Sequence, residues 1–433
     1  MTSALIIGAG VAGPVTAMAL QQAGIDATIY EAYPRGADTA GAFLTLQING
    51  ISALRVIGAD HAVAGLGFAT PAMRFSSGSG KHLGMVHTGG TLADGTASQT
   101  LKRSDLYRAL RDEALRRGAR MIYDKRLVDA RVHAGGVTAI FADGTRAEGD
   151  LLIGCDGIRS RVRSVIDPAA PRARYVPVLN IGGYAPGLFP DRRSAASGAE
   201  LGSATSLRQG SPRGSQDERF SEAVTGDYHM IFGKRAFFGY AVAPDGAAWW
   251  FANPPRKDEP SDDELASMSS DEWRAWLLDL FAVDRSPAVD IIRATPDPLR
   301  GWATYDIPSV PTWHNDTMVV IGDAAHATAP SSGQGASMAI EDAVVLAKCL
   351  RDLPTVAEAF VAYEALRRER VERVVAVGAR SSSTKVAGPV GRVFRDLAMP
   401  FFLRKVAGRG TESLAWLHQH RIDWETPVLA SAA

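Results

Sequence analysis

The stretch Ala4-Leu5-Ile6-Ile7-Gly8-Ala9-Gly10-Val11-Ala12-Gly13 decides the fold of this 433-residue chain. Residues 4–7 form a short apolar run bounded by glycine, which is typical of a buried parallel strand. Residues 12–23 then predict a helix, and residues 27–30 predict a second strand that ends at acidic Glu31. A strand, a glycine-rich turn, a helix and a second strand make a βαβ unit, so the sequence predicts a Rossmann-like α/β fold.

Each glycine of the Gly8-x-Gly10-x-x-Gly13 motif has its own role in such a unit. Gly8 allows the tight turn, Gly10 lets the backbone approach a pyrophosphate, and Gly13 lets helix and strand pack closely. The helix that begins at Val11 and Ala12 offers N–H groups and partial positive charge to the phosphates. The motif therefore predicts a dinucleotide site, but it does not separate FAD from NAD.

Two aspartates further along the chain also follow buried strands. Asp156 comes after the apolar residues 151–153, and Asp323 comes after residues 318–321 and a glycine. Open α/β sheets bind ligands at these strand ends, and a carboxylate there can accept from a polyol such as a ribityl chain. Residues 330–337 form a glycine-containing loop that opens a long helix, which suits a ring that becomes anionic on reduction. Each aspartate alone could instead cap its own loop, but the three motifs together favour FAD.

Composition bounds the class of protein. Lys plus Arg and Asp plus Glu both number 47, so the net charge is zero. Because a polyanion is bound by a basic protein surface, we expect no nucleic-acid partner. There are only two cysteines, Cys155 and Cys349, and they lack metal-ligand spacing, so they cannot build a disulfide framework or a zinc cluster. We therefore expect no metal site and a reducing cytoplasm. No uncharged apolar run reaches the ~18 residues of a membrane span, so we expect no stable membrane insertion.

The sequence predicts a discontinuous chain organisation. We expect an FAD/NAD(P)-binding domain formed by residues 1–170 and 285–380. An antiparallel β-sheet substrate domain, residues 171–284, is inserted between them and carries a long loop over about 191–225. A C-terminal helical segment, residues 381–433, completes the chain.

The sequence also makes predictions about two helix boundaries, a group of aromatic strands and a basic apolar segment near the C-terminus. Ser104 is predicted to be the N-cap of a helix over 105–117, and Pro400 is predicted to break the helical tail. The aromatic strands within 228–251 are either sheet core or a wall of the substrate site. Residues 386–409 are apolar and basic together, as in a helix that lies on a membrane, although we expect them to pack on their own protein.

The chain resembles the class A flavoprotein monooxygenases, the para-hydroxybenzoate hydroxylase-like family. The resemblance spans about residues 3–380. It is carried, in order, by Gly8 to Gly13, by Glu31, by Lys102 to Leu106, by Asp156 to Arg163, and by Gly322 to His326 with Pro330.

This resemblance implies FAD as the cofactor and NADPH or NADH as the co-substrate. Glu31 would bind the adenosine ribose, Arg103 would reach the pyrophosphate or ribityl region, and Leu127 would offer backbone contacts to adenine. Asp156 would help to position FAD and meet the nicotinamide, and Asp323 would hold the ribityl chain. The cofactor-binding residues expected in full are Gly8, Gly10, Val11, Ala12, Gly13, Glu31, Arg103, Leu127, Asp156, Gly322, Asp323, Pro330, Gly333, Gly335 and Ala336.

The resemblance also implies the chemistry. NAD(P)H would reduce the flavin, O2 would form a flavin C4a-hydroperoxide, and one oxygen would pass to an aromatic, polycyclic or polyketide-type small molecule. The cofactor carries the difficult step, so we name no catalytic residue, and we interpret His326 as structural. The expected assembly is a monomer or a homodimer.

Three further functions remain open. A flavin-dependent halogenase would carry Trp-x-Trp-x-Ile-Pro, and the nearest run here, Trp249-Trp250-Phe251-Ala252-Asn253-Pro254, does not match it. An isoprenoid reductase would share the fold but not the oxygen transfer. A non-catalytic flavin-binding protein would consume NAD(P)H and O2 only weakly.

Overall fold

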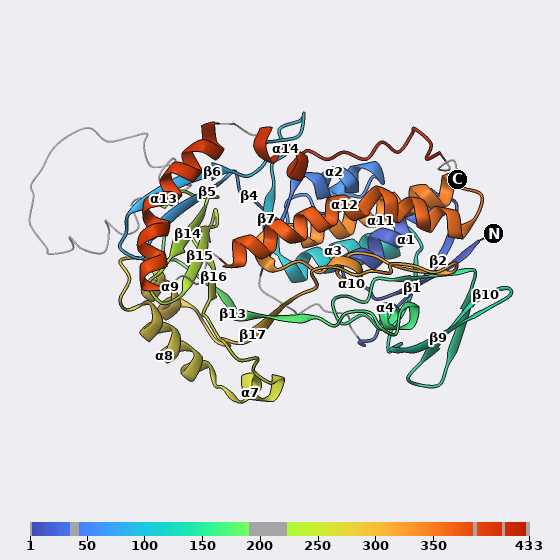
Figure 1. Cartoon of the computed structure of the whole chain (residues 1–433), viewed down its shortest axis with the longest axis horizontal. Coiled ribbons are helices and arrows are strands. Elements are labelled where there is room, and N and C mark those ends of the chain that lie inside the picture. Colours follow the sequence, from blue (N-terminus) through green and yellow to red (C-terminus); the bar gives the residue numbers. More distant parts are fainter. Residues whose placement is uncertain (1, 35–42, 190–222, 384–387, 409–411, 430–433) are drawn as a thin grey trace, which may run out of the picture.

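The computed structural model describes residues 2–34, 43–189, 223–383, 388–408 and 412–429. The loop expected over about 191–225 lies almost wholly outside these residues. In Figure 1 a parallel sheet with its helices occupies one end of the long axis, and a larger antiparallel sheet occupies the other. The predicted α/β fold with an antiparallel sheet is thereby confirmed.

The parallel sheet has the strand order β18-β12-β1-β2-β8. Its strands are β1 (Ser3–Ile7), β2 (Asp26–Tyr30), β8 (Arg120–Ile122), β12 (Leu151–Gly154) and β18 (Met318–Val320). Neighbouring residues of β1 point to opposite faces, because Leu5 lies against Gly149 of β11 and Ile6 lies against Gly13 of α1. The sheet is therefore covered on both faces, which explains why its strands are apolar throughout.

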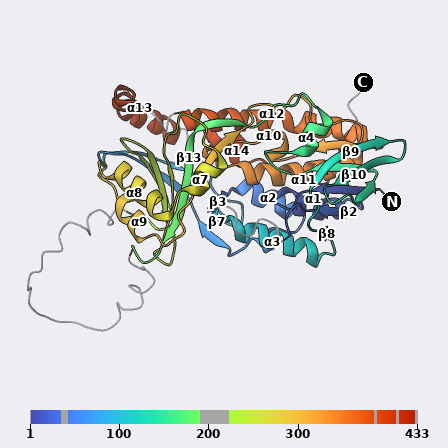
Figure 2. The ribbon, with the colours of Figure 1, turned by 90° about the horizontal axis from the view of Figure 1, so that it is seen from below.

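Figure 1 shows helices over one face of this sheet and a small sheet with one short helix over the other, and Figure 2 looks from below onto that small sheet. The helical layer is α1 (Ala12–Gln22), α2 (Ile48–Val56), α11 (Gly335–Asp352) and α12 (Val356–Ser383). The opposite layer is β9 (Leu127–His133), β10 (Gly136–Phe141), β11 (Arg146–Gly149) and α4 (Arg161–Ile166).

The large sheet has seven strands in the order β17-β13-β16-β15-β14-β5-β6. They are β5 (Ala72–Ser77), β6 (His82–His87), β13 (Arg174–Ala185), β14 (Tyr228–Phe232), β15 (Phe237–Val242), β16 (Ala248–Asn253) and β17 (Gly301–Asp306). All neighbours are antiparallel except β14 and β5. The sheet thus draws strands from residues outside 171–284, and the domain boundaries themselves stay a prediction.

Three helices pack on one face of the seven-stranded sheet: α7 (Asp262–Ser267), α8 (Ser270–Phe281) and α9 (Ala288–Ala294). The core between them is aromatic. Phe238 stacks on Trp250 with ring centroids 5.4 Å apart and meets Phe281 of α8 edge-on at 5.2 Å. The aromatic side chains on this face are therefore sheet core and not a wall of the substrate site.

A third sheet, in the order β3-β7-β4, joins the two ends of the molecule. It contains β3 (Phe43–Leu46), β4 (Gly67–Ala69) and β7 (Gln99–Lys102). The remaining elements are η1 (Asp60–Ala62), α3 (Arg103–Arg116), α10 (Asp323–His326), η2 (Pro330–Ser332), α13 (Pro389–Gly408) and α14 (Glu412–His418).

Two local predictions are wrong. Helix α3 begins at Arg103, so Ser104 lies inside the first turn, and its hydroxyl donates to Asp105 instead of capping the helix. Helix α13 runs through Pro400 without ending. Proline cannot donate to the carbonyl four residues earlier, and Lys81 Nζ donates to that oxygen, on Asp396, from 3.4 Å. A side chain from the turn between β5 and β6 thus replaces the missing hydrogen bond.

The C-terminal helices are not bilayer spans. None of the described helices combines the length and the apolar character that crossing a membrane requires.

Candidate functional site

The predicted site residues gather at the carboxyl edge of the parallel sheet. Gly8 N donates to Tyr30 O at 2.8 Å, and Cys155 N donates to Ile7 O at 2.8 Å. Ile321 N donates to Gly154 O at 3.0 Å. These bonds continue the sheet to the ends of its central strands, so the turns that carry Gly8, Glu31, Asp156 and Asp323 emerge at one edge.

The glycine turn has one position that faces open space. Gly8 has φ +102°, and a methyl group placed on it would lie 2.5 Å from Cys155 O. A methyl on Gly13 would lie 2.0 Å from Gly8 O, so both positions exclude larger residues. A methyl on Gly10 would meet no protein atom within 4 Å. The backbone at Gly10 is therefore accessible to a ligand, as a pyrophosphate requires.

The carboxylate of Glu31 is buried beside this turn. It accepts from Ala9 N at 2.7 Å and from Tyr33 N at 3.0 Å. The backbone carbonyl of Glu31 accepts from Lys125 N at 2.8 Å. This bond brings the start of β9, with Leu127, close to Glu31. A carboxylate has about four acceptor sites, so Glu31 keeps capacity for ribose hydroxyls.

Asp156 is engaged within its own loop. Its carboxylate accepts from Ser160 Oγ at 2.5 Å, from Arg161 N at 2.7 Å and from Val162 N at 3.0 Å. Burial raises the pKa of Asp156, while Ser160 and the two N–H groups oppose the rise. Ser160 is the N-cap of α4, and Asp156 accepts from two N–H groups of its first turn. A contact with nicotinamide stays a prediction.

Asp323, Arg103 and Gly335 come together from three distant segments. Asp323 is exposed at the start of α10, and its Oδ1 lies 3.7 Å from a methyl placed on Gly335. Arg103 is exposed, and its Nε donates to Tyr107 Oη at 2.5 Å. Burial raises the pKa of Tyr107, Arg103 lowers it, and the carboxylate of Asp323 raises it further. Tyr107 was missed from the sequence, although its spacing of four residues from Arg103 on one helix could have found it.

The loop before α11 presents the remaining predicted residues. Pro330 is exposed in η2, Gly333 has φ +60°, and Gly335 and Ala336 open α11. Neither α11 nor α1 has a side-chain cap, whereas α4 is capped by Ser160. The first N–H groups of both long helices are thus left for another acceptor.

A buried ion cluster lies directly behind Gly322. Asp342 accepts from Gly322 N at 2.9 Å, and it also contacts His326 Nε2 and accepts from Arg367 Nε at 2.7 Å. Arg367 also binds Glu341 at 2.7 Å, and all four side chains are buried. His326 is therefore held inside the protein by Asp342, in agreement with a structural role. The adjacent acids Glu341 and Asp342, within an apolar helix pattern, were the sequence signal for this cluster.

An aromatic face lies on the side of the seven-stranded sheet that is opposite α8. Phe43 of β3 sits among the rings of Tyr184, Tyr228, Trp249 and Phe251, with centroids 5.8–6.4 Å away. Phe43, Tyr184 and Phe251 are only half-buried. This aromatic face thus borders the predicted flavin site, because Phe43 pairs with Lys102, the neighbour of Arg103.

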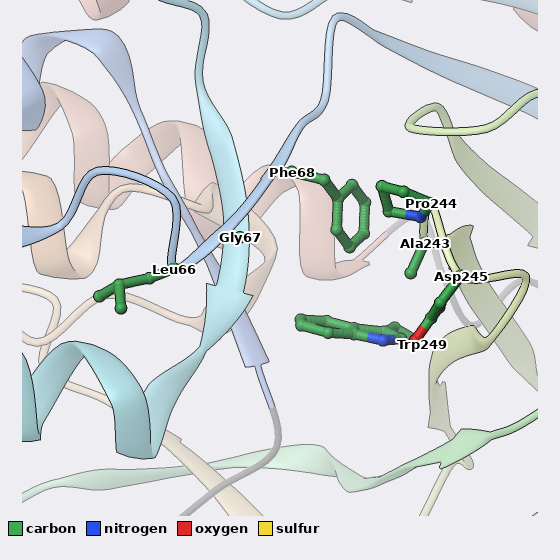
Figure 3. A pocket seen from close by; sticks show the side chains of 7 residues that line it. All are labelled: Leu66, Gly67, Phe68, Ala243, Pro244, Asp245 and Trp249. Atoms are coloured by element: carbon green, nitrogen blue, oxygen red, sulfur yellow. The ribbon is translucent and has the colours of Figure 1, made fainter. Parts of the chain in front are cut away.

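A hollow of about 350 Å³ opens beside the aromatic face (Figure 3). Trp249 belongs to both, since it lines the hollow and meets Tyr184 edge-on at 5.1 Å. The lining residues are Leu66, Gly67, Phe68, Ala243, Pro244, Asp245 and Trp249.

These residues fit FAD. The open backbone at Gly10 and the uncapped start of α1 suit its pyrophosphate, and the buried acid Glu31 suits its ribose. Asp323 and the uncapped start of α11 suit the ribityl chain and the flavin ring. A Rossmann-like fold with this edge and an aromatic sheet beside it defines the class: a protein that binds FAD at the carboxyl edge of its parallel sheet.

Comparison with known proteins identifies the family. The sequence model of the FAD binding domain matches residues 1–181 and 267–377, which is more than half of the chain. The chain therefore belongs to this family, the class A FAD-dependent monooxygenases, and its cofactor is FAD.

Relatives match over nearly the whole chain. Aurachin C monooxygenase/isomerase of Stigmatella aurantiaca is 30% identical over 379 residues, covering 86% of both proteins. FAD-dependent urate hydroxylase of Klebsiella pneumoniae is 29% identical over 380 residues, covering 86% of this chain and 87% of the relative. A crystal structure of a Klebsiella pneumoniae protein with FAD and uric acid superposes with a TM-score of 0.76 and 25% identity, covering 95% of each chain.

Proposed function

We propose that this monooxygenase uses NADH or NADPH and O2 to hydroxylate an electron-rich aromatic or polycyclic small molecule that binds against the aromatic face. The observation that carries this proposal is the position of that face. It borders the Lys102–Arg103 junction and exposes half-buried rings on the side of the sheet opposite α8. Relatives are named for aurachin C, urate and salicylate.

The proposed cofactor site consists of the fifteen residues expected from the sequence. Gly8 to Gly13 would bind the pyrophosphate, Glu31 and Leu127 the adenosine, and Arg103 and Asp323 the ribityl region. The loop from Pro330 to Ala336 would line the ring. FAD, when bound, accepts reducing equivalents from NAD(P)H and activates O2. The protein orients the substrate and excludes water around it.

The aromatic face supplies apolar contact, and Lys102 supplies a positive charge beside it. Its ammonium lies 5.1 Å from the Tyr184 ring centroid and 5.8 Å from that of Trp249. A phenolate or carboxylate on an aromatic substrate could pair with this cation while its ring stacks on the face. We further propose a monomeric or homodimeric cytoplasmic protein.

Stopped-flow reduction of the FAD-loaded enzyme by NADH or NADPH tests the function. A panel of phenols, quinones and fused-ring aromatics should contain a substrate that accelerates reduction and yields a product with one oxygen from O2. Weak consumption of NAD(P)H and O2 with every compound would instead indicate a non-catalytic flavin protein. A halogenated product would indicate a halogenase, and a product reduced without oxygen transfer would indicate a reductase.

The variant Asp323→Ala tests the proposed site separately. It removes the exposed carboxylate beside Gly335, so it should weaken FAD binding by about tenfold or more. Unchanged FAD occupancy and turnover would show that the flavin lies elsewhere.

A further inference from the structure

Helix α13 exposes a row of large apolar side chains. Phe394, Leu397 and Phe401 are 75%, 65% and 78% exposed, and the neighbouring Phe402 is 63% exposed. Spacings of three and four residues place the first three on one face of the helix. We call these four residues the α13 stripe. Contiguous exposed apolar surface of this kind marks an interaction site.

The other face of α13 is firmly attached to the protein. Leu403 is buried with Leu83, Phe232 and Phe237. The Arg395 guanidinium lies 4.5 Å from the centroid of the Phe232 ring. The hydrogen bond from Lys81 to Asp396 O then replaces the bond that Pro400 cannot make. The expectation that this segment packs on its own protein therefore holds for one face only, and the stripe stays outside.

The charge of α13 is positive around the stripe. Its sequence holds Arg392, Arg395, Arg404 and Lys405 and a single acid, Asp396. That acid is already paired with Arg395 at 3.0 Å. The half-buried Arg392 and the exposed Arg404 lie toward opposite ends of the helix and bracket the stripe.

This charge pattern distinguishes between possible occupants. Two copies of the stripe packed against each other would place arginine near arginine in either helix direction, which is repulsive. An apolar row bracketed by cations instead matches a helix that lies in the interface of an anionic bilayer, with its rings among the acyl chains and its cations at the headgroups.

We propose that α13 binds this protein peripherally to the surface of anionic lipid bilayers. Figures 1 and 2 both place α13 at the end of the molecule that carries the seven-stranded sheet. Met230 and Phe251 pack against the cluster beneath α13 and also against the core of the aromatic face. The bilayer contact would thus adjoin the proposed substrate face, although the binding does not depend on the reaction.

Vesicle flotation of the full-length, FAD-loaded enzyme tests the proposal. Vesicles of phosphatidylcholine with about 30% phosphatidylglycerol, which attract basic segments, are compared with pure phosphatidylcholine. The protein should float with the anionic vesicles at least about tenfold more strongly, and 0.5 M salt, roughly a 4 Å Debye length, should release much of it.

The double variant Phe394→Ser/Phe401→Ser should lose this binding by about tenfold while its FAD content and thermal midpoint stay unchanged, because both side chains are exposed. The matched control is Val361→Ser/Leu366→Ser on α12, where the side chains are 56% and 54% exposed, and it should float like the parent. Arg404→Glu should weaken only the binding to anionic vesicles.

Equal flotation of the stripe variant and its parent would overturn the proposal. So would failure of the parent to float. A parent that is dimeric without lipid and becomes monomeric in the stripe variant would assign the stripe to a second copy instead. None of these outcomes involves turnover, so failure of the lipid-binding proposal can be distinguished from failure of the proposed hydroxylase function.

Discussion

At the scale of single residues, two glycines of one turn separate folding from cofactor binding. Gly10→Ala adds a methyl group that meets no protein atom, so the stability of the apo-protein should change by less than about 1 kcal/mol. The same methyl stands where the pyrophosphate would approach, so FAD affinity should fall by about tenfold or more. Thermal unfolding of the apo-protein and fluorescence titration with FAD measure the two effects.

The comparison variant is Gly13→Ala. Its methyl would lie 2.0 Å from Gly8 O, so this variant should lose stability before any ligand is added. Full FAD affinity in Gly10→Ala would contradict the proposed position of the pyrophosphate.

Lys102 provides a second prediction at this scale. Lys102→Met removes the cation near Tyr184 and Trp249 but keeps a long apolar stem. KM should rise by about tenfold for aromatic substrates with a carboxylate or phenolate, and it should stay unchanged for neutral ones. Steady-state kinetics on such a matched pair of substrates checks this, with Lys348→Met near the end of α11 as the control. An equal rise for both substrates would count against charge pairing.

At the scale of elements, the buried ion cluster fixes α11 against α12. Arg367→Met would leave Glu341 and Asp342 buried without their shared cation, which should cost about 3–5 kcal/mol. Because Asp342 also accepts from Gly322 N, FAD binding should weaken as well. Urea unfolding and FAD titration measure both effects.

The neighbouring residue on α12 offers a matched control. Arg368 pairs with Glu364 and Glu372 at the partly exposed surface and donates to the carbonyls of Val310 and Pro311. Because both acids stay solvated when it is removed, Arg368→Met should cost less than Arg367→Met, about 1–2 kcal/mol. Similar losses for the two variants would show that burial does not set the value of the cluster.

The elements also show what sequence can and cannot predict. The βαβ unit was predictable because apolar periodicity and the needs of a glycine turn are local properties. The uninterrupted helix at Pro400 was not, because Lys81 of a distant segment satisfies the freed carbonyl. The pairing of Arg367 with two acids likewise depends on how α12 packs on α11. The residue roles in FAD binding are proposed from local pattern and chemistry, and the variants Asp323→Ala and Gly10→Ala test them.

At the scale of the whole molecule, the third sheet is hydrogen-bonded to the seven-stranded sheet through side chains. Thr45 and Thr100 of the third sheet both donate to Tyr228 Oη of the seven-stranded sheet, at 3.0 Å and 3.1 Å. Phe43 belongs to the same third sheet, so the flavin edge and the aromatic face are positioned by one connecting element. Substitutions within this sheet would therefore alter the relative placement of cofactor and substrate rather than either site alone.

One buried histidine and two half-buried ones contribute to the response of the molecule to acid. Burial lowers the pKa values of His229, His418 and His420 to about 4. In the unfolded chain an ordinary histidine has a pKa of about 6.5, so below that pH the unfolded state binds protons that the folded state does not. Stability should therefore be full above pH 6.5 and should fall as the pH drops toward 4.

His418 allows this dependence to be assigned to one residue. Burial is the main cause of its low pKa, the positive charge of Arg370 adds to it, and Gln334 Nε2 donates to its Nδ1 at 3.2 Å. A shift of this size is worth about 3 kcal/mol at pH 4. His418→Gln has no proton to gain, so its unfolding free energy from urea titrations should fall less steeply between pH 6.5 and 4.5 than that of the parent. Parallel curves for the two proteins would mean that His418 does not remain neutral in the folded state.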